Sequence, residues 1–378
     1  MSEPNFYVLI FVRGNAMRNY FWIGFLSIAW LLSGNQRLYS QAAPKQIEST
    51  ELTQTIITPV MEVPIVPGNN LIYCSTFQIA WNMLQDSVIR EEIRLTGDPE
   101  VVRLLDKQMS TAEDISEDCY VAMVDTLTRE FLDRINRALR SKFGENAPPE
   151  VKQQINPAAT QILAYAYLFK SLQFPVQFDR FEYPMTFRLD EEYVSVESFG
   201  VKGFSTGDKQ DEVRGQVQIY YSRNEWEYVV GLKSASEADE IILAKIPSPK
   251  SLFEAITSTA YRVNMLTPTS LEFGQSLVIP VFDYDVKHSF SDLMGKHFLN
   301  EDWTDWFISD AVQWIRFKMD EKGVVLKSEA KIEMVTGMAQ SFRFSPPFLV
   351  YLRNKDGKFP YFAMWVDNAE LMAKFQQR

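Results

Sequence analysis

Apolar and charged residues alternate along residues 324–334, directly after Gly323. Successive strand residues point to opposite faces of a sheet, so a period of two predicts a strand with one buried and one solvated face. The set predicted to be buried is Val324, Leu326, Ser328, Ala330, Ile332 and Met334. The set predicted to face water is Val325, Lys327, Glu329, Lys331 and Glu333.

Longer apolar patterns predict the elements of the first half. Residues 160–174 (TQILAYAYLFKSLQF) are too continuously apolar for a surface strand and indicate the middle of a covered sheet. The strand-like NLIYC at 70–74 leads into a helix from about Ser75, whose hydroxyl is expected to cap it. A strand at 120–128 precedes a second helix, which begins near Thr128 and stops at Gly144.

The second half is dominated by strand patterns. Short β runs separated by turn residues fill 182–233, and a further apolar strand covers 276–286. A helical turn is expected at 248–258 and a short helix at 290–298. The C-terminus predicts a hairpin whose turn contains Asp356-Gly357. With no repeat and no splitting linker, this order predicts one α+β domain with large mixed sheets and helices in the N-terminal half.

The N-terminus has the pattern of an export signal. Arg18 precedes an apolar core from Tyr20 to Leu32, and small residues precede a cut after Ala42. That core is short for a membrane span, although an uncleaved anchor that includes FYVLIFV at 6–12 is an open alternative.

These features divide the chain into three predicted parts. Residues 1–42 are a signal peptide, with Met17 as an alternative start; residues 43–68 are a polar, proline-punctuated extension; and residues 69–378 are the folded domain. The predicted location is secreted, periplasmic or extracellular, with no stable membrane span after cleavage.

The net charge and the few histidines and cysteines limit which classes of function are expected. The net charge of -11 comes without a basic run, which argues against nucleic-acid binding. The two histidines, His288 and His297, and the two cysteines do not have metal-ligand spacing, and neither histidine lies beside a nucleophile motif. We therefore expect no enzyme activity, no metal and no cofactor. Cys74 and Cys119 are compatible with a disulfide or with two buried thiols.

Five segments, in order, resemble the serpin family. They are NNLIYCSTFQIAWNML at 69–84, TQILAYAYLFK at 160–170, LVIPVFDYDVKHSFSDLMGKHF at 277–298, DAVQWIRFKMDEKG at 310–323, and FRFSPPFLVYLRNKDGKFPYFAMWVDN at 342–368. The resemblance implies a divergent, shortened member of the family with a serpin-like α+β fold.

The resemblance also implies a mechanism. A protease cuts an exposed reactive-centre loop, and the freed loop inserts as a strand into the main sheet. The partner implied is a serine or cysteine protease that prefers small residues, and the inhibitor is a monomer. The implied loop and hinge residues are Glu321, Gly323, Val324, Leu326, Ser328 and Ala330. The implied scissile region is Thr336, Gly337 and Met338.

Two departures keep other interpretations open. Bulky Val324, Val325 and Leu326 follow the hinge glycine, where inhibitory serpins have small residues. Between Gly144 and Thr160 there are too few residues for the helix that crosses the main sheet in serpins. A serpin-fold protein that binds a ligand or has a structural role, without inhibiting, is therefore the second interpretation. An unrelated α+β fold is the third.

Overall fold

The computed structural model describes residues 46–171, 173–189, 192–322 and 340–376. Contacts divide the chain into residues 1–43 and residues 44–378, and all described elements belong to the second unit. The predicted signal peptide, residues 1–42, lies outside the described residues. No helix in the described ranges is both long and apolar enough to cross a membrane.

Among the described residues, three α-helices precede residue 144 and two follow it. They are α1 (Ser75–Met83), extended by the π-helical η2 (Leu84–Ile89), α2 (Glu100–Leu105), α3 (Arg129–Phe143), α4 (Asp208–Gly215) and α5 (Leu252–Met265). The single-turn 3-10 helices are η1 (Ser49–Glu51), η3 (Ala112–Asp114), η4 (Glu117–Cys119), η5 (Gly144–Asn146) and η6 (Glu301–Trp303).

The ends of α1 and α3 test the predicted caps. Thr128 Oγ1 accepts the Phe131 N–H at 3.1 Å, and Gly144, with φ of 53°, follows the last residue of α3. This confirms the α3 limits. The predicted cap of α1 is wrong: Cys74 occupies the N-cap position, and the buried Ser75 hydroxyl has no partner among the described residues.

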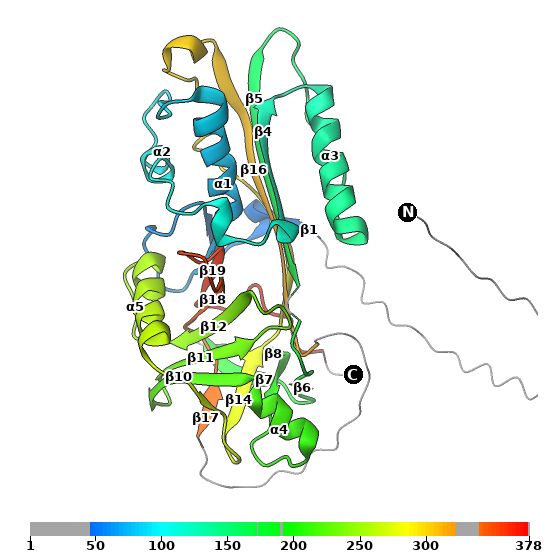
Figure 1. Cartoon of the computed structure of the whole chain (residues 1–378), viewed down its shortest axis with the longest axis vertical. Coiled ribbons are helices and arrows are strands. Elements are labelled where there is room, and N and C mark those ends of the chain that lie inside the picture. The colour runs from blue at the N-terminus through cyan, green and yellow to red at the C-terminus, as the bar shows by residue number, and fades with distance from the viewer. Residues whose placement is uncertain (1–45, 172, 190–191, 323–339, 377–378) are drawn as a thin grey trace, which may run out of the picture. The chain divides into compact units, whose positions relative to one another are not determined.

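The main sheet has five strands in the order β1-β15-β16-β5-β4. Their bounds are β1 Gln46–Glu48, β4 Tyr120–Thr126, β5 Thr160–Ser171, β15 Phe282–Ser289 and β16 Trp306–Met319. β5 lies between two neighbours and is buried over Ile162–Leu168, which confirms the prediction of a covered central strand. The long strands of this sheet run along the vertical axis of Figure 1.

The second sheet has eight strands in the order β13-β10-β11-β12-β18-β19-β3-β2. The bounds are β2 Thr55–Thr58, β3 Asn70–Cys74, β10 Val217–Asn224, β11 Glu227–Lys233, β12 Asp239–Lys245, β13 Thr269–Ser270, β18 Phe348–Asn354 and β19 Phe362–Val366. β18 and β19 form the predicted C-terminal hairpin, and Phe348–Leu352 is buried.

Smaller sheets complete the fold. A four-stranded sheet has the order β17-β14-β9-β6, with β6 Asp179–Arg180, β9 Ser198–Val201, β14 Ser276–Pro280 and β17 Ser341–Arg343. β7 (Met185–Leu189) and β8 (Glu192–Val196) form an antiparallel pair.

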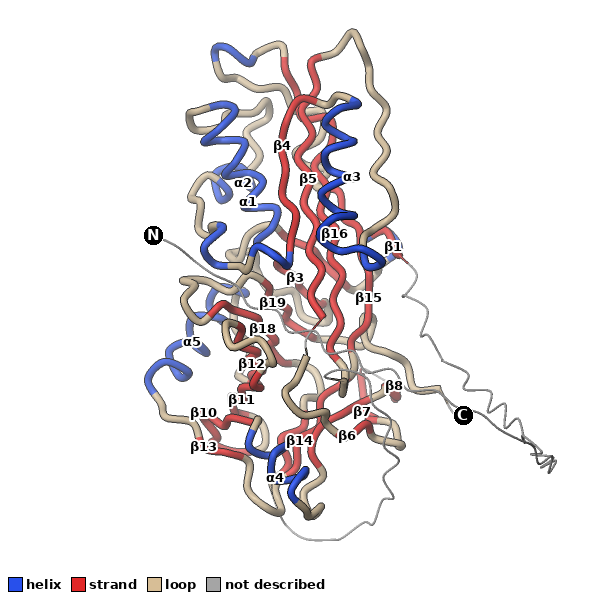
Figure 2. Tube along the Cα trace, turned by 45° about the vertical axis from the view of Figure 1, so that its right-hand side comes forward, coloured by secondary structure: helices blue, strands red, loops and turns tan. Residues whose placement is uncertain are grey.

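The main sheet is covered on both faces. Phe77 and Trp81 of α1 share a buried cluster with alanines and isoleucines of β5 and β16. On the opposite face, Phe131, Ile135 and Leu139 of α3 pack with aromatic residues of the same two strands. Figure 2 shows α3 lying along this sheet. Because side chains alternate across each strand, β5 and β16 contact α1 on one face and α3 on the other.

The structure corrects one predicted helix and adds one that was not predicted. Residues 290–298 form turns rather than a helix, because Gly295 has a positive φ of 69° and the backbone bonds link Leu293 to Phe290 and Met294 to Ser291. Helix α4 was not predicted. As predicted, residues 145–159 form no helix longer than the single-turn η5, and the face of the main sheet opposite α1 is covered by α3, which precedes Gly144.

Candidate functional site

The site predicted from the family resemblance begins where β16 ends. Of its residues, the described part of the chain includes only Glu321. Outside the described residues lie Gly323, Val324, Leu326, Ser328, Ala330, Thr336, Gly337 and Met338. The described chain resumes at Gln340 and joins the four-stranded sheet as β17, so the two ends of the predicted loop belong to different sheets.

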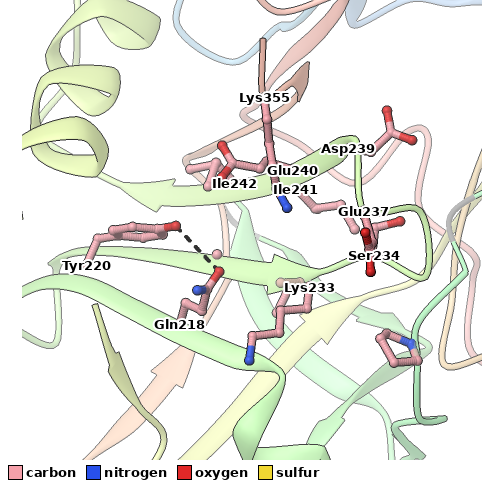
Figure 3. A pocket seen from close by; sticks show the side chains of 13 residues that line it. Gln218, Tyr220, Lys233, Ser234, Glu237, Asp239, Glu240, Ile241, Ile242 and Lys355 are labelled. Atoms are coloured by element: carbon pink, nitrogen blue, oxygen red, sulfur yellow. Dashed lines mark hydrogen bonds between the residues drawn. The ribbon is translucent and has the colours of Figure 1, made fainter. Parts of the chain in front are cut away.

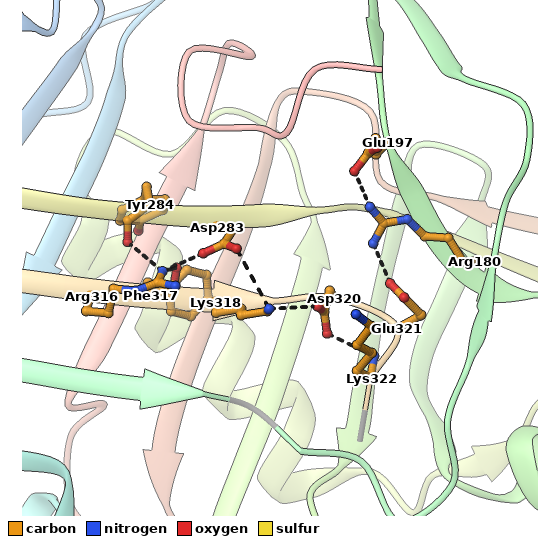
Figure 4. A network of polar contacts seen from close by, with 10 residues as sticks. All are labelled: Arg180, Glu197, Asp283, Tyr284, Arg316, Phe317, Lys318, Asp320, Glu321 and Lys322. Carbon is orange, nitrogen blue, oxygen red and sulfur yellow. Dashed lines mark hydrogen bonds and ion pairs between the residues drawn. The ribbon is translucent and has the colours of Figure 1, made fainter. Parts of the chain in front are cut away.

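Glu321 is held by a polar network at the end of the main sheet (Figure 4). Its carboxylate pairs with Arg180, which also pairs with Glu197. Its backbone carbonyl accepts the Phe178 N–H at 3.1 Å. The Glu321 side chain is only 8% exposed. Removing one partner of such a pair leaves a buried charge without compensation, so Arg180 fixes the point where the chain leaves β16.

Sequence reasoning missed Arg180. It is separated from Glu321 by 141 positions, and nothing in its neighbourhood marks it as an ion-pair partner. Its role follows only from the pairing of β6 with β9, which carries Arg180 to the end of the main sheet.

A row of ion pairs lies along the end of β16. Lys318 Nζ lies 3.3 Å from Asp320 Oδ2 and 3.8 Å from Asp283 Oδ2, and Arg316 lies 2.5 Å from Asp283 Oδ1. The Lys322 N–H donates to Asp320 Oδ1 at 2.9 Å. These contacts join β16 to β15, so this corner of the sheet is held by side chains as well as by backbone hydrogen bonds.

The neighbours β16 and β5 pair directly along their whole length. They are parallel, and their register runs from Trp306 opposite Thr160 to Lys318 opposite Ser171. β15 pairs with the other edge of β16 in antiparallel fashion. The β5–β16 seam, meaning the shared edge of these two strands, is therefore closed and ends beside Glu321.

The layer between the β5–β16 seam and α3 contains buried polar groups without hydrogen-bond partners among the described residues. The Tyr165 hydroxyl of β5 and the Trp314 Nε1 of β16 are buried under α3, and neither makes a hydrogen bond within the described ranges. Burial raises the pKa of Asp285 on β15 to about 6, with Arg316 acting in the opposite direction. An unsatisfied buried polar group costs about 1–3 kcal/mol, so the closed arrangement holds some unfavourable energy.

The cysteines and the acidic residues add no further chemistry. Cys74 and Cys119 are both buried and do not form a disulfide in this structure, so the alternative of two buried thiols holds. Burial raises the pKa of Cys74 to about 11, which keeps it protonated and unreactive. Across the part of the chain that the structure describes, no three His, Cys, Asp or Glu side chains are placed to hold a metal.

A second feature is a pocket of about 340 Å³ on the eight-stranded sheet (Figure 3). Tyr220 lies over Gly231, where a Cβ atom would come within 2.7 Å of the ring. Charged side chains of both signs line the pocket, including Lys233, Lys355 and Glu237. The pocket therefore combines an aromatic ring with charged groups of both signs.

Comparisons with known proteins identify the fold. No family model matches the chain, and no curated protein matches its sequence. A solved thyroxine-binding globulin in complex with thyroxine matches at 11% identity and a TM-score of 0.50, over 79% of this chain and 92% of that chain.

Two further solved structures have lower scores. Serpin48, a highly specific serpin of the insect Tenebrio molitor, matches at 13% identity with a TM-score of 0.45, over 79% of this chain and 91% of its own. Uncleaved ovalbumin matches at 14% identity with a TM-score of 0.45, over 78% and 92%. The thyroxine-binding globulin match, together with the sheet order described above, shows that this chain has the serpin fold.

Proposed function

We propose that this protein is an exported protease inhibitor whose loop, residues 323–339, is cut and then inserts into the β5–β16 seam. The observation that carries the proposal is the position of Glu321. It lies two residues after Met319, the last residue of the strand that borders the seam, and the alternating sequence at 324–334 follows after Lys322 and Gly323. The serpin fold supports this function only as a framework, because the same fold serves several functions.

Insertion would exchange one kind of pairing for another. A strand that turned back from Glu321 into the seam would run antiparallel to both β5 and β16. One parallel ladder would then become two antiparallel ladders, which are slightly more stable per residue. Each added hydrogen bond contributes about 0.5–1.5 kcal/mol net. Val324, Leu326, Ala330, Ile332 and Met334 would be buried, and all four charges would stay on the other face.

The proposed target is a serine or cysteine protease that accepts small residues at Thr336–Met338. The inhibitor would act as a monomer outside the cell or in the periplasm, after removal of residues 1–42. Bulky residues at 324–326 would slow insertion, because overpacked positions cost about 1–3 kcal/mol each. Trapping of the acyl-enzyme depends on whether insertion is faster than hydrolysis.

The test is the thermal stability of the protein before and after a nick at 335–338. We expect a large rise in Tm on cleavage. Leu326→Asp should abolish the rise because it places an unpaired carboxylate inside the sheet, whereas Lys327→Asp, on the wet face, should leave it nearly unchanged. A nicked protein that melts at or below the intact one would overturn the proposal. Stabilisation without an SDS-resistant protease complex would show insertion without inhibition.

The pocket of Figure 3 favours a second candidate function, the binding of a small aromatic zwitterion. The matched globulin structure contains thyroxine, which makes ligand binding a function that this fold can support. Binding of free tyrosine and related aromatic amino acids, measured by calorimetry, tests this idea. Tyr220→Ala should abolish binding, and the exposed Trp226→Ala should not. Equal binding by both variants would exclude this pocket.

A further inference from the structure

The segment Ala369–Phe375, called the strap below, follows β19. It pairs with residues next to the Arg180 ion pairs with Glu197 and Glu321, which are called the hinge network. Its Ala369, Leu371 and Met372 are 3 to 5% exposed and belong to the same core as β9, β14 and β15. Met372 forms a bridge with Phe282, and Lys374 forms a bridge with Val196. The strap is therefore packed and paired, although it lies outside the named strands.

Three backbone segments close a ring of hydrogen bonds at the strap. The Val281 N–H donates to Glu197 O, the Glu197 N–H donates to Ala373 O, and the Ala373 N–H donates to Val281 O, each at 2.9 Å. The Phe375 N–H adds a bond to Ser195 O at 3.2 Å. Loss of the strap would therefore leave the Glu197 N–H without its acceptor and the carbonyl of the buried Val281 without its donor.

Both hydrogen-bond partners of Ala373, Glu197 and Val281, are connected to Glu321. Glu197 pairs through its side chain with Arg180, which pairs with Glu321. Val281 precedes Phe282, which lies opposite Met319 at the end of β16. The strap is thus connected to Glu321 in two ways. One connection is the ion pairs of Arg180, and the other is the pairing of β15 with β16.

From this arrangement we infer that the strap is a conformational lock, which holds Glu197 and Val281 in place and so keeps the hinge at Glu321 closed. Its effect on the rate of insertion rests on the proposed function. Its effect on the hinge of the intact protein does not.

The first test is hydrogen exchange of the intact full-length protein. Ala373→Pro removes one donor from the ring, and Gln376→Ala, at an exposed position, is the control. We expect the amides of Glu197, Val281 and Phe178 to exchange about 2- to 10-fold faster in Ala373→Pro, the size of one backbone hydrogen bond, with β12 unchanged. Faster exchange at Glu197 and Val281 alone, with Phe178 unaffected, would overturn the lock.

A milder variant guards against loss of folding. Deletion of 375–378 removes the Phe375 bond but keeps the buried Leu371 and Met372, so it should give a smaller change of the same kind. The second measurement is the time course of stabilisation after a loop nick, which should be faster in both variants. If the nicked wild-type chain gains no stability, the proposed function fails while the exchange result still decides the lock. If it gains stability at the same rate in all variants, the lock fails.

Discussion

The two large sheets of this protein differ in how their central strands are joined. In the eight-stranded sheet, β12, β18, β19 and β3 are antiparallel neighbours, and the residues of β18 and β19 between Phe348 and Leu352 and between Phe362 and Val366 are all buried. In the five-stranded sheet, the central pair β5–β16 is parallel, joins segments far apart in the sequence, and ends in a cluster of charges. In the proposed insertion the first sheet stays unchanged, and the second opens between β5 and β16.

The proposed insertion depends on the parallel pairing of β5 and β16. Two parallel strands leave room for one antiparallel strand between them, which pairs with both. An antiparallel pair offers no such gain, because a strand inserted there would be parallel to one neighbour. The contrast therefore predicts that substitutions in the two sheets act differently on the intact and the cleaved protein.

The largest expected effect is in the eight-stranded sheet. Trp365 is 1% exposed and packs against residues of α5 and β18. Trp365→Ala should cost about 3–5 kcal/mol of unfolding free energy, in the intact and cleaved proteins alike, because this sheet does not change on insertion. Urea denaturation of both forms measures the cost. A much smaller loss in the cleaved form would contradict a permanent core.

The next effect is at the hinge. Arg180→Ala leaves the carboxylates of Glu197 and Glu321 facing each other without a cation, and should cost about 2–3 kcal/mol in the intact protein after allowance for partial exposure. The double variant Arg180→Ala, Glu321→Gln should recover part of this loss, because it removes one of the two charges. Chemical denaturation of the single and double variants compares them. No recovery would mean that Arg180 acts through packing.

Acid provides a third comparison within the main sheet. Burial lowers the pKa of His288 to about 4, and its Nδ1 lies 2.7 Å from Ser49 Oγ. The unfolded chain binds a proton below about pH 6.5 and the folded one only below about 4, so stability falls as the pH drops across this window. Asp285, with its pKa raised to about 6, has the opposite effect between about pH 6 and 4.

His288→Gln separates these two contributions. Glutamine cannot take up the proton, so the variant should lose about 2 kcal/mol less than wild type between pH 6.5 and 4. Melting curves at several pH values give the difference. Parallel stability profiles for the two proteins would show that His288 does not titrate in this range. Asp285→Asn is the reciprocal control and should change the profile in the other direction.

Local signals in the sequence were enough for the elements that depend on near neighbours. Thr128 and Gly144 fixed the limits of α3, and Asp356-Gly357 marked the hairpin turn, because caps and turns are made within a few residues. The apolar run at 160–174 indicated a covered strand because both of its faces are buried.

Features set by distant partners could not be predicted in this way. Residues 290–298 look amphipathic, yet Gly295 and pairing with 306–308 turn them into a loop. The extension at 43–68 supplies β1 and β2, whose pairing with β15 and β3 depends on the finished sheets. The Arg180–Glu321 pair needs both the four-stranded sheet and the main sheet in place before its two side chains meet.

The smallest expected effect compares two buried tyrosines. Tyr165 under α3 and Tyr351 under α5 are each 1% exposed, and neither hydroxyl has a partner among the described residues. Removing an unsatisfied hydroxyl should stabilise the intact protein by about 1 kcal/mol in both Tyr165→Phe and Tyr351→Phe. Tyr351 lies in the sheet that stays closed, so its variant should gain equally before and after loop cleavage. Tyr165 borders the seam, and its gain should be confined to the intact protein and should slow stabilisation after the nick. Differential scanning calorimetry of each variant, intact and cleaved, against wild type measures these gains. Equal gains for both variants in both forms would mean that Tyr165, next to the seam, is no more unfavourable than Tyr351 in the eight-stranded sheet.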